Sequence, residues 1–397
     1  MLVVTRDGEK LSLKAKFVIK LIKSNYDVQF LKVFRRDGKK YVEEHKGNHI
    51  YLATSTFGIF MYFLLNFFLK NPKDLHDGMI RRLRRREKIP VAGGRGFVTI
   101  ISQVLYQYFA RSAKTLGLLR FLRKLNFSPT FLVDEFFSLN VVDLRLLKRL
   151  GHVIYISSDL AYDFYGDNLI ASRLMYRFEQ RSIVLADLVI ACSQRDKLKY
   201  LEMGAKEVTY YPNIYPLNKL GEVAKDPNAS VSIVLKEHWG IRGNSLLEDV
   251  LVALGKVNQK IRIYMIGTKP LSIPKNIDLR YYDYIPGRSD YLRTLSTSWI
   301  GINLGVHAGG SNQRKYDYAM AGLVVFSDKL GARGDLLPHE YTFTDIFDLT
   351  AKLQQLVNLG KEEVAAMGAE NRRYALSLAK QKHDELSMKI KDMHLCT

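Results

Sequence analysis

One stretch in the second half of the sequence combines residue types that bind phosphate with one that binds sugar hydroxyls. From Ser311 a basic, polar entry leads into a short helical pattern that contains a single acid, Asp317. Gly322, the usual left-handed helix cap, ends the pattern before a buried-looking strand, Leu323–Phe326. Amides and cations at a helix N-terminus bind anions, and a carboxylate one turn further in accepts hydrogen bonds from hydroxyls. The stretch therefore predicts a nucleotide-sugar site, with cations and amides for phosphate and Asp317 for ribose.

This segment resembles the signature of retaining glycosyltransferases of family 4, which have the GT-B fold. From Lys315 to Val325 it reads Lys-Tyr-Asp-Tyr-Ala-Met-Ala-Gly-Leu-Val-Val, with Asp317 in the place of the usual Glu. The resemblance implies an α/β fold of the GT-B kind, with two Rossmann-like doubly wound domains facing across a cleft. It also implies a hexosyltransferase that moves a hexose-type sugar from a nucleoside diphosphate sugar to an acceptor, with retention.

Two cations follow the first strand that we expect in the second domain. In the resembled family an Arg and a Lys at this point hold the diphosphate, and here Lys236 and Arg242 stand there in the reverse order. Positive charge at a departing diphosphate stabilises the transition state more than the ground state. The resemblance therefore assigns catalytic roles to Lys236 and Arg242. It implies no metal cofactor, because the two cations carry the charge that a divalent ion would neutralise.

The loop before the signature helix is rich in small and polar residues. Gly309 and Gly310 allow the backbone to approach a ligand closely. Many relatives have a glutamate for the donor sugar at the position of Gly309, so its absence leaves the identity of the sugar open. We expect the donor to contact this loop and the helix that follows it, through His307, Gly309, Gly310, Ser311, Asn312, Lys315 and Asp317.

The first domain is expected to supply the acceptor side of the reaction. In open parallel sheets ligands bind beyond the carboxyl ends of the strands. Asp134 and Glu135 end one expected strand, and Asp159 follows the strand His152–Ile156. Any of these carboxylates suits the orientation or deprotonation of an acceptor hydroxyl, although a lone acid at a strand end is more often a helix cap. Gly8, after the first strand, permits close approach of donor or acceptor.

Short apolar runs alternate with helical patterns along the chain, which indicates two doubly wound parallel sheets. We expect an acceptor-binding domain over residues 1–217, a nucleotide-sugar-binding domain over 218–375, and a last helix over 376–397 that crosses back to the first domain. From Asp345 to Met393 the pattern is helical throughout. The expected strands are Met1–Thr5, Tyr26–Val33, His49–Ala53, Phe131–Val133, His152–Ile156, Leu188–Ala191, Val231–Leu235, Ile261–Ile266, Leu279–Tyr284, Ile300–Leu304 and Leu323–Phe326, and a further strand ends in the segment Tyr210–Ile214.

The chain of 397 residues has a net charge of +20, which attracts anionic partners. An apolar run, Ile50–Leu69, precedes a basic cluster, and a second aromatic and basic stretch follows over Phe97–Leu125. Apolar aromatics beside basic residues are typical of binding to an anionic membrane surface. We therefore expect a peripheral protein at the cytoplasmic face of the cell membrane, with a lipid-linked or glycan acceptor. The basic cluster consists of Arg81, Arg82, Arg84, Arg85, Arg86 and Lys88.

Alternatives remain open at this stage. The apolar run is equally consistent with a core helix of the first domain, and the acceptor with a soluble molecule. The missing glutamate also allows an inverting or non-catalytic relative. A nucleic-acid-binding protein fits the charge, but the sequence has no zinc knuckle, helix-turn-helix or RNA-recognition motif, so no nucleic acid is expected. The isolated cysteines, Cys192 and Cys396, fit a reducing compartment and form no metal-binding spacing.

Overall fold

The computed structural model describes two compact units. It describes residues 1–6, 13–23, 27–33, 44–46, 49–52, 129–134, 144–157, 169–216, 224–235, 240–257, 260–267, 269–270, 272–305, 313–329, 331–332 and 334–395. The first unit comprises the described residues up to Tyr211 together with the end of the chain from Leu386 on. The second unit extends from Pro212 to Glu385.

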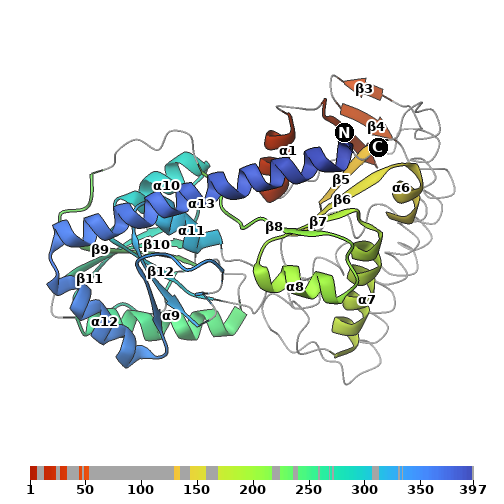
Figure 1. Ribbon diagram of the computed structural model, residues 1–397. Helices are drawn as coiled ribbons and strands as arrows, with labels where there is room; N and C mark the ends of the chain where they lie inside the picture. Colours follow the sequence, from red (N-terminus) through yellow and green to blue (C-terminus); the bar gives the residue numbers. More distant parts are fainter. Residues whose placement is uncertain are drawn as a thin grey trace. The chain divides into compact units, whose positions relative to one another are not determined.

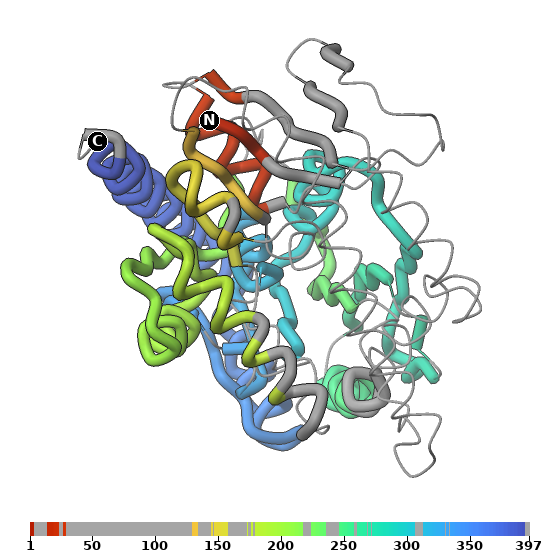
Figure 2. Tube along the Cα trace, turned by 90° about the vertical axis from the view of Figure 1, so that its right-hand side faces the viewer, coloured from red at the N-terminus to blue at the C-terminus, as the bar shows by residue number. Residues whose placement is uncertain are grey.

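The first unit is built on an eight-stranded sheet in the order β3-β4-β2-β1-β5-β6-β7-β8. Neighbouring strands are parallel except β3 and β4, which pair antiparallel. Figure 2 shows the first strands in red beside the yellow and orange segment that contains β5 and β6. The strands are β1 (Leu2–Arg6), β2 (Gln29–Val33), β3 (Glu44–Lys46), β4 (His49–Leu52), β5 (Thr130–Asp134), β6 (His152–Ile156), β7 (Leu188–Ala191) and β8 (Val208–Tyr210).

Apolar side chains cover both faces of this sheet, as a doubly wound fold requires. Successive strand residues point to opposite faces. Val153 and Tyr155 thus belong to one core cluster, and Ile154 and Ile156 belong to the other. The first cluster includes residues of three helices, α6 (Leu144–Leu150), α7 (Leu169–Leu185) and α8 (Gln194–Glu202). The second includes α1 (Leu13–Lys23) and the last turns of α13 (Lys361–Leu395).

The second unit contains a six-stranded sheet in the order β11-β10-β9-β12-β13-β14, with all neighbours parallel. Helices α9 (Gly240–Gly255) and α12 (Ile346–Asn358) lie on one face, and α10 (Arg288–Ser296), α11 (Gln313–Met320) and part of α13 lie on the other (Figure 1). The strands are β9 (Ala229–Leu235), β10 (Ile261–Gly267), β11 (Ile277–Tyr282), β12 (Ile300–Asn303), β13 (Val324–Asp328) and β14 (Glu340–Phe343).

The structure corrects the expectation of unbroken helix from Asp345 to Met393. Two helices occupy this stretch, since α12 ends at Asn358 and α13 begins at Lys361. Gly360 lies between them with φ of 89°, a conformation that residues with a side chain rarely adopt. The strands β3 and β14 were not expected from the sequence. They have only three and four residues, which is too short for a clear alternation of apolar and polar residues.

The membrane-related expectations fall mostly outside the described residues. Most of the apolar run Ile50–Leu69 lies there, as do the basic cluster and the stretch Phe97–Leu125. Among the helices that the structure describes, none combines the length and apolarity needed to cross a membrane.

Candidate functional site

The candidate site lies where the strand order of the second sheet reverses. β10 and β11 follow β9 on one side, whereas β12, β13 and β14 lie on its other side. The carboxyl ends of β9 and β12 therefore form the switch point, where open parallel sheets bind their ligands. Helix α11, which follows β12 in the chain, contains the first part of the signature, from Lys315 to Met320.

Two side chains of α11 hold the ends of these strands where their pairing stops. The last paired residues of β9 and β12 are Ile233 and Ile302. Beyond them the Tyr318 hydroxyl accepts from the amide of Val234 (2.9 Å) and donates to the carbonyl of Ile302 (3.1 Å). One turn earlier in α11, Arg314 donates to the carbonyl of Val234 (2.8 Å).

Arg314 also reaches the second strand, through a 2.7 Å hydrogen bond from Nη2 to the carbonyl of Leu304. Burial lowers the pKa of Arg314 below its ordinary value, yet an arginine stays protonated under all ordinary conditions. Residues three and four apart share one face of a helix. Arg314 and Tyr318 together thus fix α11 over the switch point, and they also fix the direction of Asp317.

Asp317 is buried, with 2% of its side chain exposed. Its Oδ1 accepts from Nη2 of Arg288 at 2.5 Å, and its Oδ2 accepts from Nε2 of Gln313 at 3.3 Å. The ion pair brings together the N-terminal residue of α10 and the middle of α11. The predicted ribose acid is thus a buried carboxylate beside a switch point, with a cation at its side.

Arg288 is placed by a glycine and an aromatic ring. Gly287 caps α10 with φ of 87° and ψ of 136°, a region open almost exclusively to glycine. The guanidinium carbon lies 5.9 Å from the centre of the Tyr291 ring, within cation–π range. Burial opposes the charge of Arg288, but the adjacent Asp317 carboxylate outweighs it and raises the pKa of Arg288.

Lys315 was expected from the sequence to contact the donor, but its side chain points elsewhere. Its side chain is fully buried, and its ammonium lies 2.7 Å from Oε2 of Glu340 on β14 and donates to the carbonyl of Ala332 at 3.1 Å. Residues two apart on a helix do not share a face. Lys315 and Asp317 therefore point in different directions, and the expected contact of Lys315 with phosphate is wrong for this structure.

The rest of the expected donor site is described in part. Arg242 lies in the first turn of α9, which follows β9, so its backbone is at the same edge of the sheet as Asp317. Lys236 lies outside the described residues, as do His307, Gly309, Gly310, Ser311 and Asn312. The start of their loop is fixed, because Oδ1 of Asp328 accepts from the amide of Gly305 at 2.6 Å.

The first sheet has its own switch point, between β1 and β5. Asp134 is the last residue of β5, so it stands at the carboxyl edge at that switch point. Glu135, Asp159 and Gly8 lie outside the described residues.

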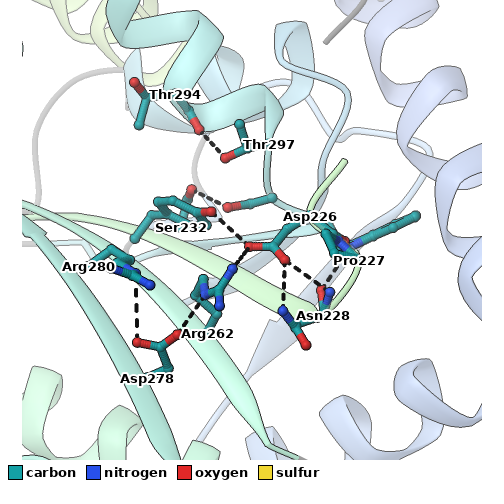
Figure 3. A network of polar contacts seen from close by, with 12 residues as sticks. Asp226, Pro227, Asn228, Ser232, Arg262, Asp278, Arg280, Thr294 and Thr297 are labelled. Carbon is teal, nitrogen blue, oxygen red and sulfur yellow. Dashed lines mark hydrogen bonds and ion pairs between the residues drawn. The ribbon is translucent and has the colours of Figure 1, made fainter. Parts of the chain in front are cut away.

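A second polar cluster lies at the opposite, amino edge of the second sheet (Figure 3). Arg262 pairs with Asp226 (2.8 Å) and with Asp278 (2.7 Å), and the Tyr264 hydroxyl donates to Asp226 (2.7 Å). Burial alone would raise the pKa of Asp226, but hydrogen bonds from Asn228, Tyr264 and Arg262 lower it on balance. Because both carboxylate oxygens of Asp226 accept hydrogen bonds, and those to Oδ2 come from Arg262 and Tyr264 of β10, the cluster fastens the segment before β9 to the sheet. No group of three or more His, Cys, Asp or Glu side chains suited to a metal occurs in the described part of the chain.

Comparison with known proteins gives the fold. No protein-family profile and no curated protein sequence matches the chain. A solved E. coli structure described as trehalose-6-phosphate bound with UDP-2-fluoro glucose superposes with a TM-score of 0.64 at 12% identity, covering 99% of this chain and 98% of that one.

Two further solved structures are similar over nearly the whole chain. An α,α-trehalose-phosphate synthase (UDP-forming) from Burkholderia vietnamiensis gives a TM-score of 0.60 at 10% identity, with 99% of each chain covered. A sucrose-phosphate synthase from Thermosynechococcus elongatus gives 0.57 at 12% identity, covering 100% of this chain and 99% of that one. These structural neighbours are glycosyltransferases of the GT-B fold, and the similarity spans the whole chain, so the fold is the expected α/β fold of the GT-B kind.

Sequence reasoning missed Arg288. The sequence did contain a sign of its role. Gly287-Arg288 follows the expected strand Leu279–Tyr284 and precedes a helical pattern, and a residue at that point lies at the carboxyl edge of a parallel sheet. Its partner is 29 residues away in the chain, and no spacing rule joins the two.

Proposed function

We propose that this protein is a glycosyltransferase that transfers a hexose-type sugar from a nucleoside diphosphate sugar to an acceptor, with retention. The observation that supports this most is the placement of Asp317, a buried carboxylate on the helix over the switch point of the second sheet. A carboxylate there accepts hydrogen bonds from ribose hydroxyls. The neighbour with UDP-2-fluoro glucose supports a nucleotide-sugar donor.

In the proposed mechanism the second unit binds the donor. Lys236 and Arg242 neutralise the charge that develops on the departing diphosphate, which lowers the barrier because this charge is largest in the transition state. Arg242 is in the first turn of α9, so the positive end of that helix adds to the same field. The donor sugar meets the loop that contains His307, Gly309, Gly310, Ser311 and Asn312. No metal ion takes part in this scheme, and full activity in EDTA is the expected result.

The first unit supplies the acceptor side. Asp134 or Asp159 orients the acceptor hydroxyl or takes its proton, since both follow strands whose carboxyl ends bind ligands in such sheets. Gly8 permits close approach of a substrate. Replacement of the responsible carboxylate by Asn is expected to lower kcat strongly while the affinity for the nucleotide stays unchanged.

Ligand-dependent melting tests the donor half of the proposal. A ligand at a hundred times its Kd stabilises the native state by about 2.7 kcal/mol. We expect UDP-, GDP- or ADP-sugars to raise the melting temperature, and Asp317→Asn to weaken binding of the effective nucleotide about tenfold to a hundredfold, from the roughly 1.5–3 kcal/mol of a charged hydrogen bond. Asp249→Asn, at an exposed position of α9, is the matched control. Absence of any shift with all three donor classes would count against the proposal.

For the acceptor we propose a lipid-linked glycan at the cytoplasmic membrane face, on the basis of the net charge of +20 and the aromatic and basic stretches of the sequence. Sedimentation with vesicles containing phosphatidylserine tests this. Binding that weakens from 50 mM to 500 mM salt is expected, and no binding at physiological salt speaks against it.

The neighbours favour a second acceptor, a free sugar phosphate, because two are named as trehalose-phosphate and sucrose-phosphate synthases. Transfer of labelled sugar to a hexose phosphate, compared with transfer to a polyprenyl-linked sugar, decides between the two. The anomeric configuration of the product, read by NMR, tests retention.

A further inference from the structure

The Asp317 carboxylate has unused acceptor capacity. It accepts from Arg288 on Oδ1 and from Gln313 on Oδ2, and from no other group among the described residues. An ionised carboxylate offers about four acceptor positions. Two positions therefore remain for a ligand, which is the number of donors in the vicinal diol of a ribose.

The two partners of Asp317 differ in strength. The Arg288 contact is a charge-assisted hydrogen bond of 2.5 Å, whereas the Gln313 contact is neutral and 3.3 Å long. A hydrogen bond to a charged group contributes roughly 1.5–3 kcal/mol, against about 1 kcal/mol for a neutral one. The orientation of the carboxylate thus depends mainly on Arg288.

Arg288 is itself held in place by further contacts, although one of its donors is buried without a partner among the described residues. Its Nη2 also donates to the carbonyl of Tyr215 at 3.3 Å, and the Tyr291 ring lies beside the guanidinium. Its Nε is buried and has no hydrogen-bond partner in the part of the chain that the structure describes. An unsatisfied buried donor costs about 1–3 kcal/mol. The shortest contact of this guanidinium is the one with Asp317, at 2.5 Å against 3.3 Å to Tyr215, so the geometry favours a role at Asp317.

We propose that Arg288 is a positioning residue of the donor site, which holds the Asp317 carboxylate in the orientation that leaves two acceptor positions for the ribose diol. The inference rests on the proposed function, since it concerns the same nucleotide site. It assigns to Arg288 an action through Asp317 and no contact with the transferred sugar.

A comparison of ribose with deoxyribose isolates this role. Isothermal titration calorimetry would compare UDP, GDP or ADP, whichever binds best, with its 2′,3′-dideoxy analogue. We expect the wild-type protein to prefer the ribose form at least tenfold. Asp317→Asn and Arg288→Met are expected to reduce that preference to less than threefold, while affinity for the dideoxy form stays within threefold of the wild-type value.

Two further variants complete the experiment. Arg288→Lys keeps the charge and is expected to recover part of the preference. Arg293→Met, at an exposed position on the same helix, is expected to keep all of it. If Arg288→Met does not fold, as judged by circular dichroism, Arg288→Gln takes its place and is expected to lose the preference in the same way.

The outcomes distinguish failure of the proposed function from failure of the positioning role of Arg288. If the wild-type protein binds none of the three nucleotides, the proposed function fails. If it prefers the ribose form and Arg288→Met keeps that preference, the positioning role is overturned while the function stands. Equal weakening of both nucleotide forms also overturns the inference, because it would show a general structural effect.

Discussion

At the residue scale, two charged side chains of α11 have unrelated roles although a single residue separates them. Asp317 faces Arg288 of α10, and Lys315 is enclosed with Glu340 of β14. Every residue of α11 from Lys315 to Met320 is buried, so the helix has neighbours on all sides. A cation at a helix N-terminus is therefore not sufficient evidence of an anion site when the helix is enclosed.

The enclosed pair leads to a prediction about stability. Lys315→Met is expected to lower the free energy of unfolding by about 3–5 kcal/mol, because it leaves the Glu340 carboxylate buried without its counter-charge. Lys315→Met with Glu340→Gln is expected to cost clearly less than the sum of the single changes. Urea denaturation measures these values.

The same variants show whether Lys315 has a structural role or a ligand-binding role. Nucleotide affinity of the folded Lys315→Met protein is expected to match that of the wild type. The control is Lys352→Met, which removes an i,i+4 pair with Asp348 at the surface and is expected to cost less than about 1 kcal/mol. A tenfold loss of nucleotide affinity in Lys315→Met would restore the phosphate role.

Asp226 provides a prediction about pH. Its pKa in the folded protein is below the ordinary 3.8, so its contribution to stability is complete above about pH 3.8 and is lost as the pH falls through the lower folded value. Asp226→Asn lacks this contribution. The stability gap between the wild type and Asp226→Asn is therefore expected to be constant from pH 7 to about 4.5 and to shrink below about pH 3.8.

Urea denaturation between pH 7 and 2.5 measures this gap. Asp249→Asn, at an exposed position of the same unit, is the control and should follow the wild type throughout. A gap that persisted unchanged to pH 2.5 would show that the Asp226 cluster does not lower its pKa.

At the element scale, close backbone approaches fix α11 between its neighbours. A Cβ on Gly301 of β12 would lie 2.4 Å from the Tyr318 ring, so only glycine lets the helix approach the sheet this closely. Just after the helix, Gly322 has φ of 75°, and a Cβ on Gly368 of α13 would lie 2.2 Å from the carbonyl oxygen of Gly322. The position of α11 thus depends on glycines that are not among the proposed donor-binding residues.

Gly368→Ala tests this packing. We expect it to destabilise the protein, whereas a Gly to Ala change in a helix usually stabilises. In an exposed helix interior, Ala is about 1 kcal/mol more favourable than Gly. Here the new Cβ would meet the Gly322 carbonyl oxygen at 2.2 Å, so we expect destabilisation by at least 1–3 kcal/mol, the usual cost of overpacking.

The control is Ala369→Gly at the next, exposed position, which is expected to lose about 1 kcal/mol as helix propensity dictates. Thermal denaturation of both variants measures the effects. A Gly368→Ala protein more stable than the wild type would mean that α13 does not approach Gly322 so closely.

At the scale of the whole molecule, one helix contributes to the cores of both units. Ala375, Leu378 and Ala379 of α13 belong to a cluster of the second unit, and Leu386 and Ile390 belong to a cluster of the first. Leu386 and Ile390 are 1% and 2% exposed. The first unit is therefore complete only with residues from the end of the chain.

Core truncation at the end of α13 is predicted to affect the first unit selectively. Leu386→Ala is expected to cost about 2–5 kcal/mol in the stability of that unit, the range for buried Leu to Ala changes. Hydrogen exchange should rise in β1 and β5 to β7, while nucleotide-dependent protection of β9 and α11 remains. Met388→Ala, at a position 65% exposed on the same helix, is the control. Equal loss of protection in both units would contradict the prediction.

Local sequence patterns were enough to predict the fold class and most of the helices and strands. β6 and β7 begin and end where the apolar runs do, and β9, β10 and β12 differ from expectation by one or two residues. Apolar runs separated by helical patterns are local features, so local composition is enough to read them. The same local reading made Asp317 a candidate, because the glycine cap and the polar entry are its neighbours in the chain.

The pairing of the charged side chains could be seen only in the folded protein. Arg288 reaches Asp317, and Lys315 reaches Glu340, because strand order and helix rotation bring together residues far apart in the sequence. Strand order is a property of the whole sheet, and the direction of a helical side chain depends on which face packs inward. Neither quantity is present in a local pattern, so the same motif could not show that Asp317 faces Arg288 whereas Lys315 faces Glu340.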